Sequence, residues 1–226
     1  MIEMKCINAP DKIKEKLNDY MELVLEYNKV MNLTGITDKD EFVEKHFYDS
    51  LLPTEVVDFN NKKIVDIGSG AGFPGIPLAI AYPNSSFLLV EPMNKRCEFL
   101  RVVKEKLNLT NVTILCERAE NIKKDQRESF DIALSRAVSN LSILLELCVP
   151  YLKVGGIFLA YKGIKYEEEL KSSKNALNSL FCEVTSVQNR KLPITNDDRF
   201  NIIIKKSKKT DLKFPRDFSQ IKKKPL

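Results

Sequence analysis

The chain has 226 residues, of which 43% are hydrophobic and 30% charged, and its formal net charge is +5. This length suits one α/β unit or one domain with an extension, and the composition excludes a disordered chain and a fibrous repeat. The sequence contains no run of about 18 apolar residues, so we expect no membrane contact. Residues 1–16 lack the apolar segment of a signal peptide, which indicates a cytoplasmic protein.

The first part of the chain is predicted to be helical. Apolar residues recur at intervals of three and four over residues 13–31, which is the spacing of one helix face. Thr37, with Asp40 three residues later, fits a capping box before a second apolar stripe over residues 42–51. We therefore predict a helical cap over residues 1–60.

From residue 61 the pattern changes to short β-rich runs separated by segments of helix length, of which residues 95–107 are the most amphipathic. This alternation is typical of an α/β fold with a mostly parallel sheet. The predicted strands are residues 64–67, 86–90, 112–116, 130–134 and 156–161. After a charged helix over residues 165–180, two further runs at 182–187 and 200–204 predict an antiparallel hairpin at the sheet edge. The sheet domain is expected to cover residues 61–206.

Positive charge is concentrated at the C-terminal end. Residues 205–226 contain nine basic and two acidic residues, a net charge of +7, so residues 1–204 carry about −2. Phe214 and Phe218 stand among these basic residues, as in segments that contact a nucleic-acid backbone. A solvated, frayed terminus is the alternative. Residues 207–226 are treated as a basic tail.

Cysteine and histidine usage limits the chemistry. The five cysteines are widely spaced and never form C-x-x-C, so we expect reduced thiols, no disulfide framework and no metal site. His46 is the single histidine, and any histidine general base would have to be this residue. Because His46 lies on an apolar helix stripe, a packed or capping role is favoured over catalysis.

The strongest motif follows the first strand of the predicted sheet. Asp66 is followed by Gly68, Gly70 and Gly72 in the pattern D-x-G-x-G-x-G. Glycine permits a positive φ and a close approach of the backbone to a ligand, and amides at the start of the next helix then face that ligand. The pattern G-x-G-x-x-G, ending at Gly75, is also present, so a dinucleotide site is the competing interpretation.

Three features of the strand ends favour a cationic ligand that carries adenosine. The carboxylate of Asp66 would repel a pyrophosphate but attract the ammonium and sulfonium groups of S-adenosylmethionine. Glu91 ends the second strand, where it suits the ribose hydroxyls of either cofactor. Ala119 and Glu120 follow the third strand, where an adenine edge would lie. A purely structural role for the glycine turn and these acids is the alternative.

Two cations end the fourth and fifth strands. A cation would not lie against a sulfonium, so Arg136 is expected to bind a carboxylate or phosphate of the cofactor or substrate. A surface salt bridge is the alternative for this residue. Lys162 is placed to reach the same cleft.

Together these residues resemble the small-subunit ribosomal RNA guanine-N7 methyltransferases, a family called methyltransferase G or glucose-inhibited division protein B. The similar segments span nearly the whole chain: residues 28–34, 46–51, 66–78, 135–137, 162–163, 215–216 and 223–226. The chain departs from the family pattern after Arg199 and at residues 217–220. These departures lie outside the cofactor motif.

The resemblance implies a class I, Rossmann-like methyltransferase fold and S-adenosylmethionine as the methyl donor. It further implies an enzyme that methylates N7 of a guanine, position 527 in the usual numbering, in 16S ribosomal RNA. The partner is expected to be 16S ribosomal RNA or the assembling small subunit, and the protein is expected to be a monomer. Guanine N7 carries a lone pair and no proton, so in-line transfer needs no general base, and orientation supplies roughly 7–11 kcal/mol.

By position in the family, cofactor contacts fall on Gly68, Phe73, Ala119, Glu120 and Arg136. With the residues argued above, the predicted cofactor site is Asp66, Gly68, Gly70, Gly72, Phe73, Glu91, Ala119, Glu120 and Arg136. Arg136 and Lys162 are the candidates for positioning the reactants. The predicted RNA contacts are Arg136, Lys162, Arg199, Arg216, Lys222, Lys223 and Lys224. A nicotinamide-dependent oxidoreductase, a non-catalytic RNA-binding module and a methyltransferase for protein or small molecules remain as rival interpretations.

Overall fold

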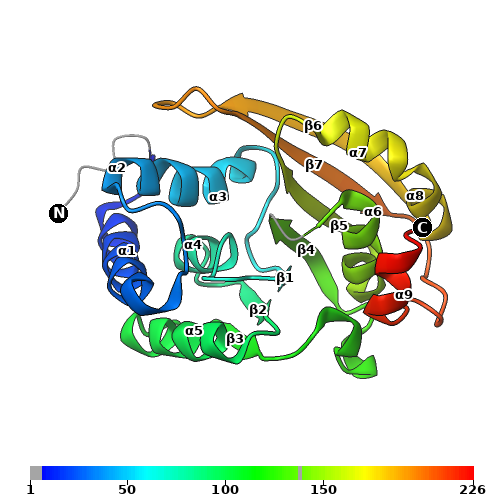
Figure 1. Ribbon diagram of the computed structural model, residues 1–226, viewed down its shortest axis with the longest axis horizontal. Coiled ribbons are helices and arrows are strands. Elements are labelled where there is room, and N and C mark those ends of the chain that lie inside the picture. Colours follow the sequence, from blue (N-terminus) through cyan, green and yellow to red (C-terminus); the bar gives the residue numbers. More distant parts are fainter. Residues whose placement is uncertain (1–6, 137–138) are drawn as a thin grey trace.

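The computed structural model describes residues 7–136 and 139–226 of the chain. In this part, seven strands form one sheet in the order β3-β2-β1-β4-β5-β7-β6 (Figure 1). Their bounds are β1 Lys63–Ile67, β2 Ser86–Val90, β3 Val112–Leu115, β4 Phe130–Arg136, β5 Leu152–Lys162, β6 Cys182–Lys191 and β7 Asp198–Lys206. The first five strands pair in parallel, whereas β7 pairs antiparallel to both β5 and β6. The predicted parallel sheet with an antiparallel edge hairpin is confirmed.

Helices cover both faces of this sheet because successive strand residues point to opposite sides. Ile64 of β1 belongs to one buried cluster and its neighbour Val65 to the other. The first face is covered by α1, α4 and α5, and the second by α6, α7, α8 and α9 (Figure 1). Their bounds are α1 Asp11–Met31, α4 Gly75–Ala81, α5 Asn94–Lys106, α6 Leu141–Cys148, α7 Tyr166–Ser172, α8 Lys174–Ser179 and α9 Phe218–Lys223.

The helical N-terminal region has the predicted long first helix and a shorter second part. That part consists of α2 (Lys39–Phe42), a π-helical turn (Val43–Tyr48), α3 (Asp49–Leu51) and a 3₁₀ turn (Leu52–Glu55). The predicted capping box is wrong, because Asp38 rather than Thr37 caps α2. The Asp38 Oδ1 atom accepts a hydrogen bond of 2.9 Å from the amide of Glu41. Both aspartate and threonine favour this position, so spacing alone did not select the right residue.

The charged helix predicted over residues 165–180 is divided between α7 and α8. The hydroxyl of Ser173, at the junction, donates to the carbonyl oxygen of Glu169 at 2.6 Å. Such a bond to the preceding turn competes with the regular helix pattern and often bends or ends a helix. The two short helices pack beside α6.

The basic C-terminal tail folds back onto the second face of the sheet. Phe214 and Ile221 are buried in the cluster that contains α6. Glu146 of α6 is fully buried and accepts hydrogen bonds from Arg216 through its backbone amide (3.0 Å), Nε (2.7 Å) and Nη2 (2.6 Å). The alternative of a frayed terminus is therefore wrong for this segment. The division into cap, sheet domain and tail stays a prediction.

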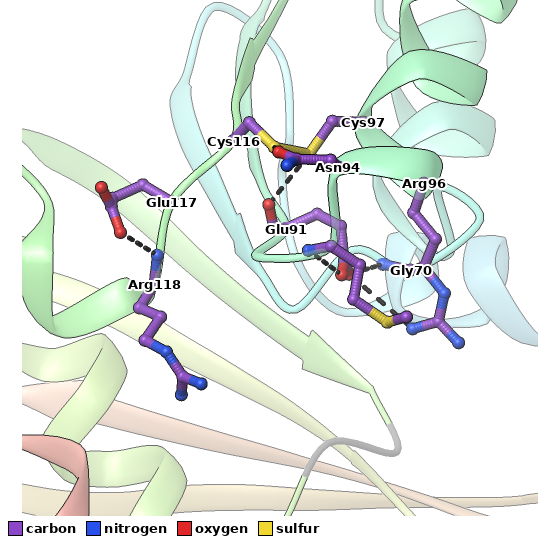
Figure 2. The surroundings of a disulfide bond; sticks show 9 residues. Gly70, Glu91, Asn94, Arg96, Cys97, Cys116, Glu117 and Arg118 are labelled. Atoms are coloured by element: carbon purple, nitrogen blue, oxygen red, sulfur yellow. Dashed lines mark hydrogen bonds and ion pairs between the residues drawn. A yellow bond between two sulfur atoms is a disulfide. The ribbon is translucent and has the colours of Figure 1, made fainter.

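Cys97 and Cys116 form a disulfide with a Cα–Cα distance of 5.8 Å, so the expectation of reduced thiols is wrong for this pair (Figure 2). Cys148 and Cys182 are free thiols. Sequence spacing concealed the pair because Cys97 lies in the first turn of α5 and Cys116 directly follows β3. The order of a parallel β-α-β unit brings both positions to the carboxyl edge of the sheet.

No helix among the described residues is long and apolar enough to cross a membrane. These residues also contain no group of three histidine, cysteine, aspartate or glutamate side chains arranged to hold a metal ion.

Candidate functional site

The glycine loop after β1 has the backbone conformation that its sequence predicted. The φ angles of Gly68, Gly70 and Gly72 are +74°, +60° and +107°. The amides of Gly68 and Ser69 donate to the carbonyl oxygen of Val90 at 2.8 and 3.1 Å. The loop is thereby fixed against the end of β2, and α4 begins three residues after it.

Gly70 and Gly72 serve this loop in different ways. A Cβ atom on Gly72 would lie 2.6 Å from Ile76 Cγ1 and 2.7 Å from the hydroxyl oxygen of Tyr20, so the absence of a side chain there is required by packing. A Cβ atom on Gly70 would have no neighbour closer than 4.0 Å. Gly70 therefore exposes its backbone to open space, where a ligand can approach.

Asp66 lies beneath the loop and is almost fully buried. Its Oδ2 atom accepts a hydrogen bond of 3.0 Å from the amide of Gly75, at the start of α4. Its Oδ1 atom has no hydrogen-bond partner among the described residues. Burial raises the pKa of the Asp66 carboxyl to about 7, against the lowering effects of the Gly75 amide and the positive charge of Arg136.

Glu91 joins the loop to the ends of β2 and β3 (Figure 2). Its Oε2 atom accepts from the amide of Gly70 at 2.9 Å, and its Oε1 atom accepts from the amide of Met93 at 3.0 Å. Its own amide donates to the carbonyl oxygen of Leu115 at 3.1 Å. A carboxylate has about four lone-pair sites, so Glu91 keeps capacity to accept from two hydroxyl groups.

The segment after β3 begins a 3₁₀ turn, Ala119–Asn121, at the predicted adenine position. Ala119 is buried, and its carbonyl oxygen accepts from the hydroxyl of Tyr151. The side chain of Glu120 is half-buried. The guanidinium of Arg118 lies 5.7 Å from the ring centroid of Phe218, so the tail packs beside this segment.

Three of the predicted RNA-binding cations line one cavity of about 600 Å³, next to the carboxyl ends of β4 and β5. These are Arg136, Lys162 and Arg199. The volume lies within the range of roughly 300–1,000 Å³ found for ligand sites. Arg216 does not line this cavity and is held by Glu146 of α6. Lys222, Lys223 and Lys224 do not line it either and are exposed.

Arg136 is held by residues of the N-terminal helical region. Its Nη1 atom donates to the carbonyl oxygen of Lys45 and to Asp49 Oδ2, both at 3.1 Å, and its Nη2 atom lies 3.2 Å from His46 Nδ1. The guanidinium also lies 5.2 Å from the ring centroid of Phe73. The salt-bridge alternative for Arg136 is therefore present, but its partner Asp49 is buried. Sequence reasoning did not assign Asp49 to the site.

His46 is packed and neutral. Its ring stacks on Phe73 with a centroid distance of 4.3 Å, and its Nε2 atom lies 2.8 Å from the hydroxyl oxygen of Thr34. Burial, with a smaller effect of the Arg136 charge, lowers the pKa of His46 to about 3. Since Arg136 carries only donors, Nδ1 accepts and Nε2 carries the proton. These contacts agree with the interpretation of a packed histidine.

Lys162 and Arg199 are also paired within the chain. The Lys162 Nζ atom donates to Glu169 Oε2 at 2.7 Å and to the carbonyl oxygen of Ser139 at 2.8 Å. Arg199 Nε lies 3.4 Å from Asp49 Oδ1. Asp49 thus lies between two of the cavity's cations and balances part of their charge.

The residues at the β1 and β2 ends suit a cationic ligand that carries ribose. Gly70 offers open backbone, Glu91 offers a carboxylate with free lone pairs, and Asp66 adds a buried carboxyl with an unpartnered oxygen. Pyrophosphate would meet these two acidic groups, and the nearby cation Arg96 is already paired with Glu91 Oε2 at 3.9 Å. These side chains and this open backbone position fit S-adenosylmethionine better than a dinucleotide.

The family profile of GidB, described as rRNA small subunit methyltransferase G, matches residues 13–197 of the chain. A ribosomal RNA small subunit methyltransferase G from Fusobacterium nucleatum is 46% identical over 225 residues, which cover 100% of this chain and 97% of the relative. The protein of the same description from Bacillus subtilis is 41% identical, covering 98% of this chain and 94% of the relative.

Solved structures show the same fold at low sequence identity. M. jannaschii TYW2 in complex with AdoMet is 16% identical with a TM-score of 0.57, covering 75% of this chain and 76% of that one. A 16S rRNA (adenine(1408)-N(1))-methyltransferase mutant from Catenulisporales acidiphilia is 14% identical with a TM-score of 0.55, covering 68% of this chain and 88% of that one. The predicted class I methyltransferase fold is confirmed.

Proposed function

Since the chain belongs to the GidB family of rRNA small subunit methyltransferase G, we propose that it transfers a methyl group from S-adenosylmethionine to N7 of a guanine in 16S ribosomal RNA. The observation that carries the proposal is the loop at Gly68–Gly72, bound to Glu91 and lying over Asp66 at the carboxyl edge of the sheet. Ligands of open α/β sheets bind at this edge.

The donor is assigned to the groups around the glycine loop. Gly68 and Gly70 approach it with backbone, Glu91 accepts from its ribose hydroxyls, and Ala119 with Glu120 border its adenine. S-adenosylmethionine supplies an electrophilic methyl group on a positively charged sulfur. Asp66 stabilises this charge from below the loop, and Phe73 separates the loop from His46 and Arg136.

The RNA is assigned to the cavity that contains Arg136, Lys162 and Arg199. These cations attract the phosphate backbone, and the planar guanidinium groups also stack on bases. A guanine in a single-stranded or splayed segment exposes N7, whereas a stacked and paired guanine does not enter a cavity of this kind. The exposed lysines of the tail do not line this cavity, and we assign them a separate contact with the RNA backbone.

Methyl transfer to N7 requires no proton removal from the acceptor, because N7 carries none. His46, the single histidine, is neutral and uses both ring nitrogens in contacts with Arg136 and Thr34. Its role is to hold Arg136, and the rate acceleration is assigned to the relative positioning of the two reactants. We place the reaction in the cytoplasm, with one chain acting on one small subunit.

The test is methylation of small ribosomal subunits that lack the modification. The protein is incubated with them and with S-adenosylmethionine labelled in the methyl group, and the RNA is treated with borohydride and aniline, which cleave at 7-methylguanine. The proposal predicts cleavage at one guanine of 16S ribosomal RNA. Label in protein or small molecules would refute the proposal. So would the absence of label in RNA supplied naked, in assembling subunits and in mature subunits.

A substitution in the glycine loop distinguishes the proposal from the rival interpretations. Gly70→Val introduces a branched side chain at a positive φ, which blocks the open backbone of the loop. The variant should lose labelling of RNA while circular dichroism shows an intact fold. A non-catalytic RNA-binding role predicts unchanged RNA affinity and no labelling with either protein, and an oxidoreductase predicts calorimetric binding of NAD in place of S-adenosylmethionine.

A further inference from the structure

The disulfide between Cys97 and Cys116 lies at the edge of the site assigned to the donor's adenosine group. Cys97 is fully buried in the first turn of α5, and Cys116 is half-buried directly after β3. The two positions are 19 residues apart in sequence. Figure 2 shows the pair above Glu91, with Arg118 on the segment that continues from Cys116.

Both sulfur atoms touch groups that shape this edge. Cys97 Sγ lies 3.0 Å from the backbone oxygen of Glu91, and Cys116 Sγ lies 3.1 Å from Asn94 Oδ1. Either contact is a hydrogen bond only when the sulfur carries a proton, because a disulfide sulfur has no donor. Oxidation therefore exchanges two weak hydrogen bonds for one covalent link between α5 and the end of β3.

The chain is expected to work in a reducing compartment, where disulfides in most organisms are transient, catalytic or redox-sensing. Cys97 lies in the first turn of α5, a helix of 13 residues, and its Sγ atom lies 3.0 Å from the backbone oxygen of Glu91. Cys116 is the accessible member, so a small reagent reaches it first. The pair thus has a half-buried attacking thiol, Cys116, and a fully buried resolving thiol, Cys97.

Resting on the proposed function, we propose that Cys97 and Cys116 are a reversible dithiol–disulfide site that takes low-molecular-weight disulfides and couples redox state to S-adenosylmethionine affinity. The Cys116 thiolate attacks one sulfur of the small disulfide, whose S–S bond breaks to release one thiol. The Cys97 thiolate then attacks Cys116 Sγ and releases the second thiol. Two electrons pass from the pair to the small disulfide, and each departing thiolate takes a proton lost by a cysteine.

The direction of the coupling follows from the position of the link. Glu91 borders the ribose on one side of the disulfide, and Ala119 with Glu120 borders the adenine on the other. The disulfide fixes the spacing of these two sides before the ligand arrives, so binding orders less of the protein. The oxidised form is expected to bind roughly three- to tenfold more tightly, and by reciprocity the ligand favours the disulfide by the same factor.

The first measurement establishes the site itself. The full-length protein is equilibrated with oxidised glutathione, trapped with an alkylating reagent and digested with trypsin. The proposal predicts a linked pair of peptides, residues 97–101 and 107–118, which disappears after reduction. A stable glutathione adduct on Cys116, or no linked peptide at any ratio of reduced to oxidised glutathione, overturns it.

The second measurement establishes the coupling. Calorimetry gives the Kd of S-adenosylhomocysteine for fully oxidised and fully reduced protein, and the glutathione titration is repeated with saturating S-adenosylhomocysteine. We expect the Kd of the oxidised form to be roughly three- to tenfold lower. Saturating ligand should raise the equilibrium constant for disulfide formation by the same factor. Cys116→Ser should bind identically under both conditions, whereas Cys182→Ser, which removes a distant thiol, should respond as the natural chain does.

The outcomes separate the two proposals. Equal Kd values in both redox states overturn the coupling and leave the proposed function standing. Failure of S-adenosylhomocysteine to bind in either state refutes the donor site of the proposed function and the coupling together, whatever the peptide map shows.

Discussion

Arg136 and Asp49, which are 87 residues apart in sequence, meet at 3.1 Å between Nη1 and Oδ2. Their contact joins the end of β4 to the N-terminal helical region. Because Arg199 of β7 approaches the other Asp49 oxygen, one buried carboxylate orients cations from two strands. The N-terminal region thereby forms one wall of the cavity assigned to RNA.

Arg136→Lys tests this arrangement. An ammonium group cannot make the three separate contacts of the guanidinium with Lys45, Asp49 and His46, so the cation would lose its fixed position. We expect methylation to fall by at least tenfold, about 1.4 kcal/mol, with the donor Kd changed by less than about threefold. Steady-state kinetics and calorimetry measure the two quantities. Arg190→Lys, which alters an exposed ion pair with Glu55, is the control and should change neither.

Asp66→Asn tests the buried carboxyl under the loop. With its pKa raised from 3.8 to about 7, the folded chain holds this proton more tightly than the unfolded chain does. The stability from this group is complete below about pH 4 and is lost as the pH rises through about 7. Urea unfolding should show that the natural chain loses about 2–3 kcal/mol relative to the variant between pH 5 and 8. Parallel stability curves for the two proteins would show that the carboxyl is not perturbed.

Glu91→Gln tests the link between the loop and the donor. The carboxylate accepts from the amides of Gly70 and Met93, and a glutamine would turn an NH₂ group toward one of them. One buried amide would lose its partner, at a cost of about 1–3 kcal/mol, and the ribose would lose an acceptor. S-adenosylmethionine should bind at least tenfold more weakly in calorimetry. Glu98→Gln, an exposed change on α5, should bind as the natural chain does.

Arg216→Met tests whether the tail is a structural element. Removing the guanidinium leaves Glu146 buried without its main partner, which typically costs about 3–5 kcal/mol. Thermal and urea unfolding should show this loss, and adding Glu146→Gln should recover part of it. Lys213→Met breaks an exposed pair with Asp211 and should have little effect.

We expect the exposed lysines of the same tail to affect RNA binding but not the stability of the fold. Replacing Lys222, Lys223 and Lys224 with glutamine should leave the unfolding free energy within about 0.5 kcal/mol. The salt dependence of RNA binding should become shallower, by up to about 0.7 in slope for each phosphate that no longer has a lysine beside it. An unchanged slope would exclude these lysines from the RNA interface.

Local sequence patterns were sufficient to predict the sheet and the glycine loop. Strand alternation and the positive φ of Gly68, Gly70 and Gly72 both follow from neighbouring residues. The same patterns did not separate Gly70, which faces open space, from Gly72, which is required by the hydroxyl of Tyr20, because Tyr20 lies far away in the sequence, on α1.

Long-range contacts account for the features that sequence reasoning missed. Asp49 was unassigned because its partners Arg136 and Arg199 come from two distant strands. The Cys97–Cys116 disulfide was missed because helix and strand order, rather than spacing, brings the two sulfurs together. The tail's composition indicated nucleic-acid binding but did not reveal that Arg216 pairs with Glu146.

The most direct test of positioning without a general base is the pH dependence of methyl transfer in a single turnover. Enzyme in excess over unmodified small subunits is saturated with S-adenosylmethionine, which removes any effect of Asp66 ionisation on donor binding. With His46 neutral and N7 free of a proton, the rate constant should change by less than about twofold between pH 6 and 8.5. A tenfold rise per pH unit below a plateau would require a titrating base and would contradict the account.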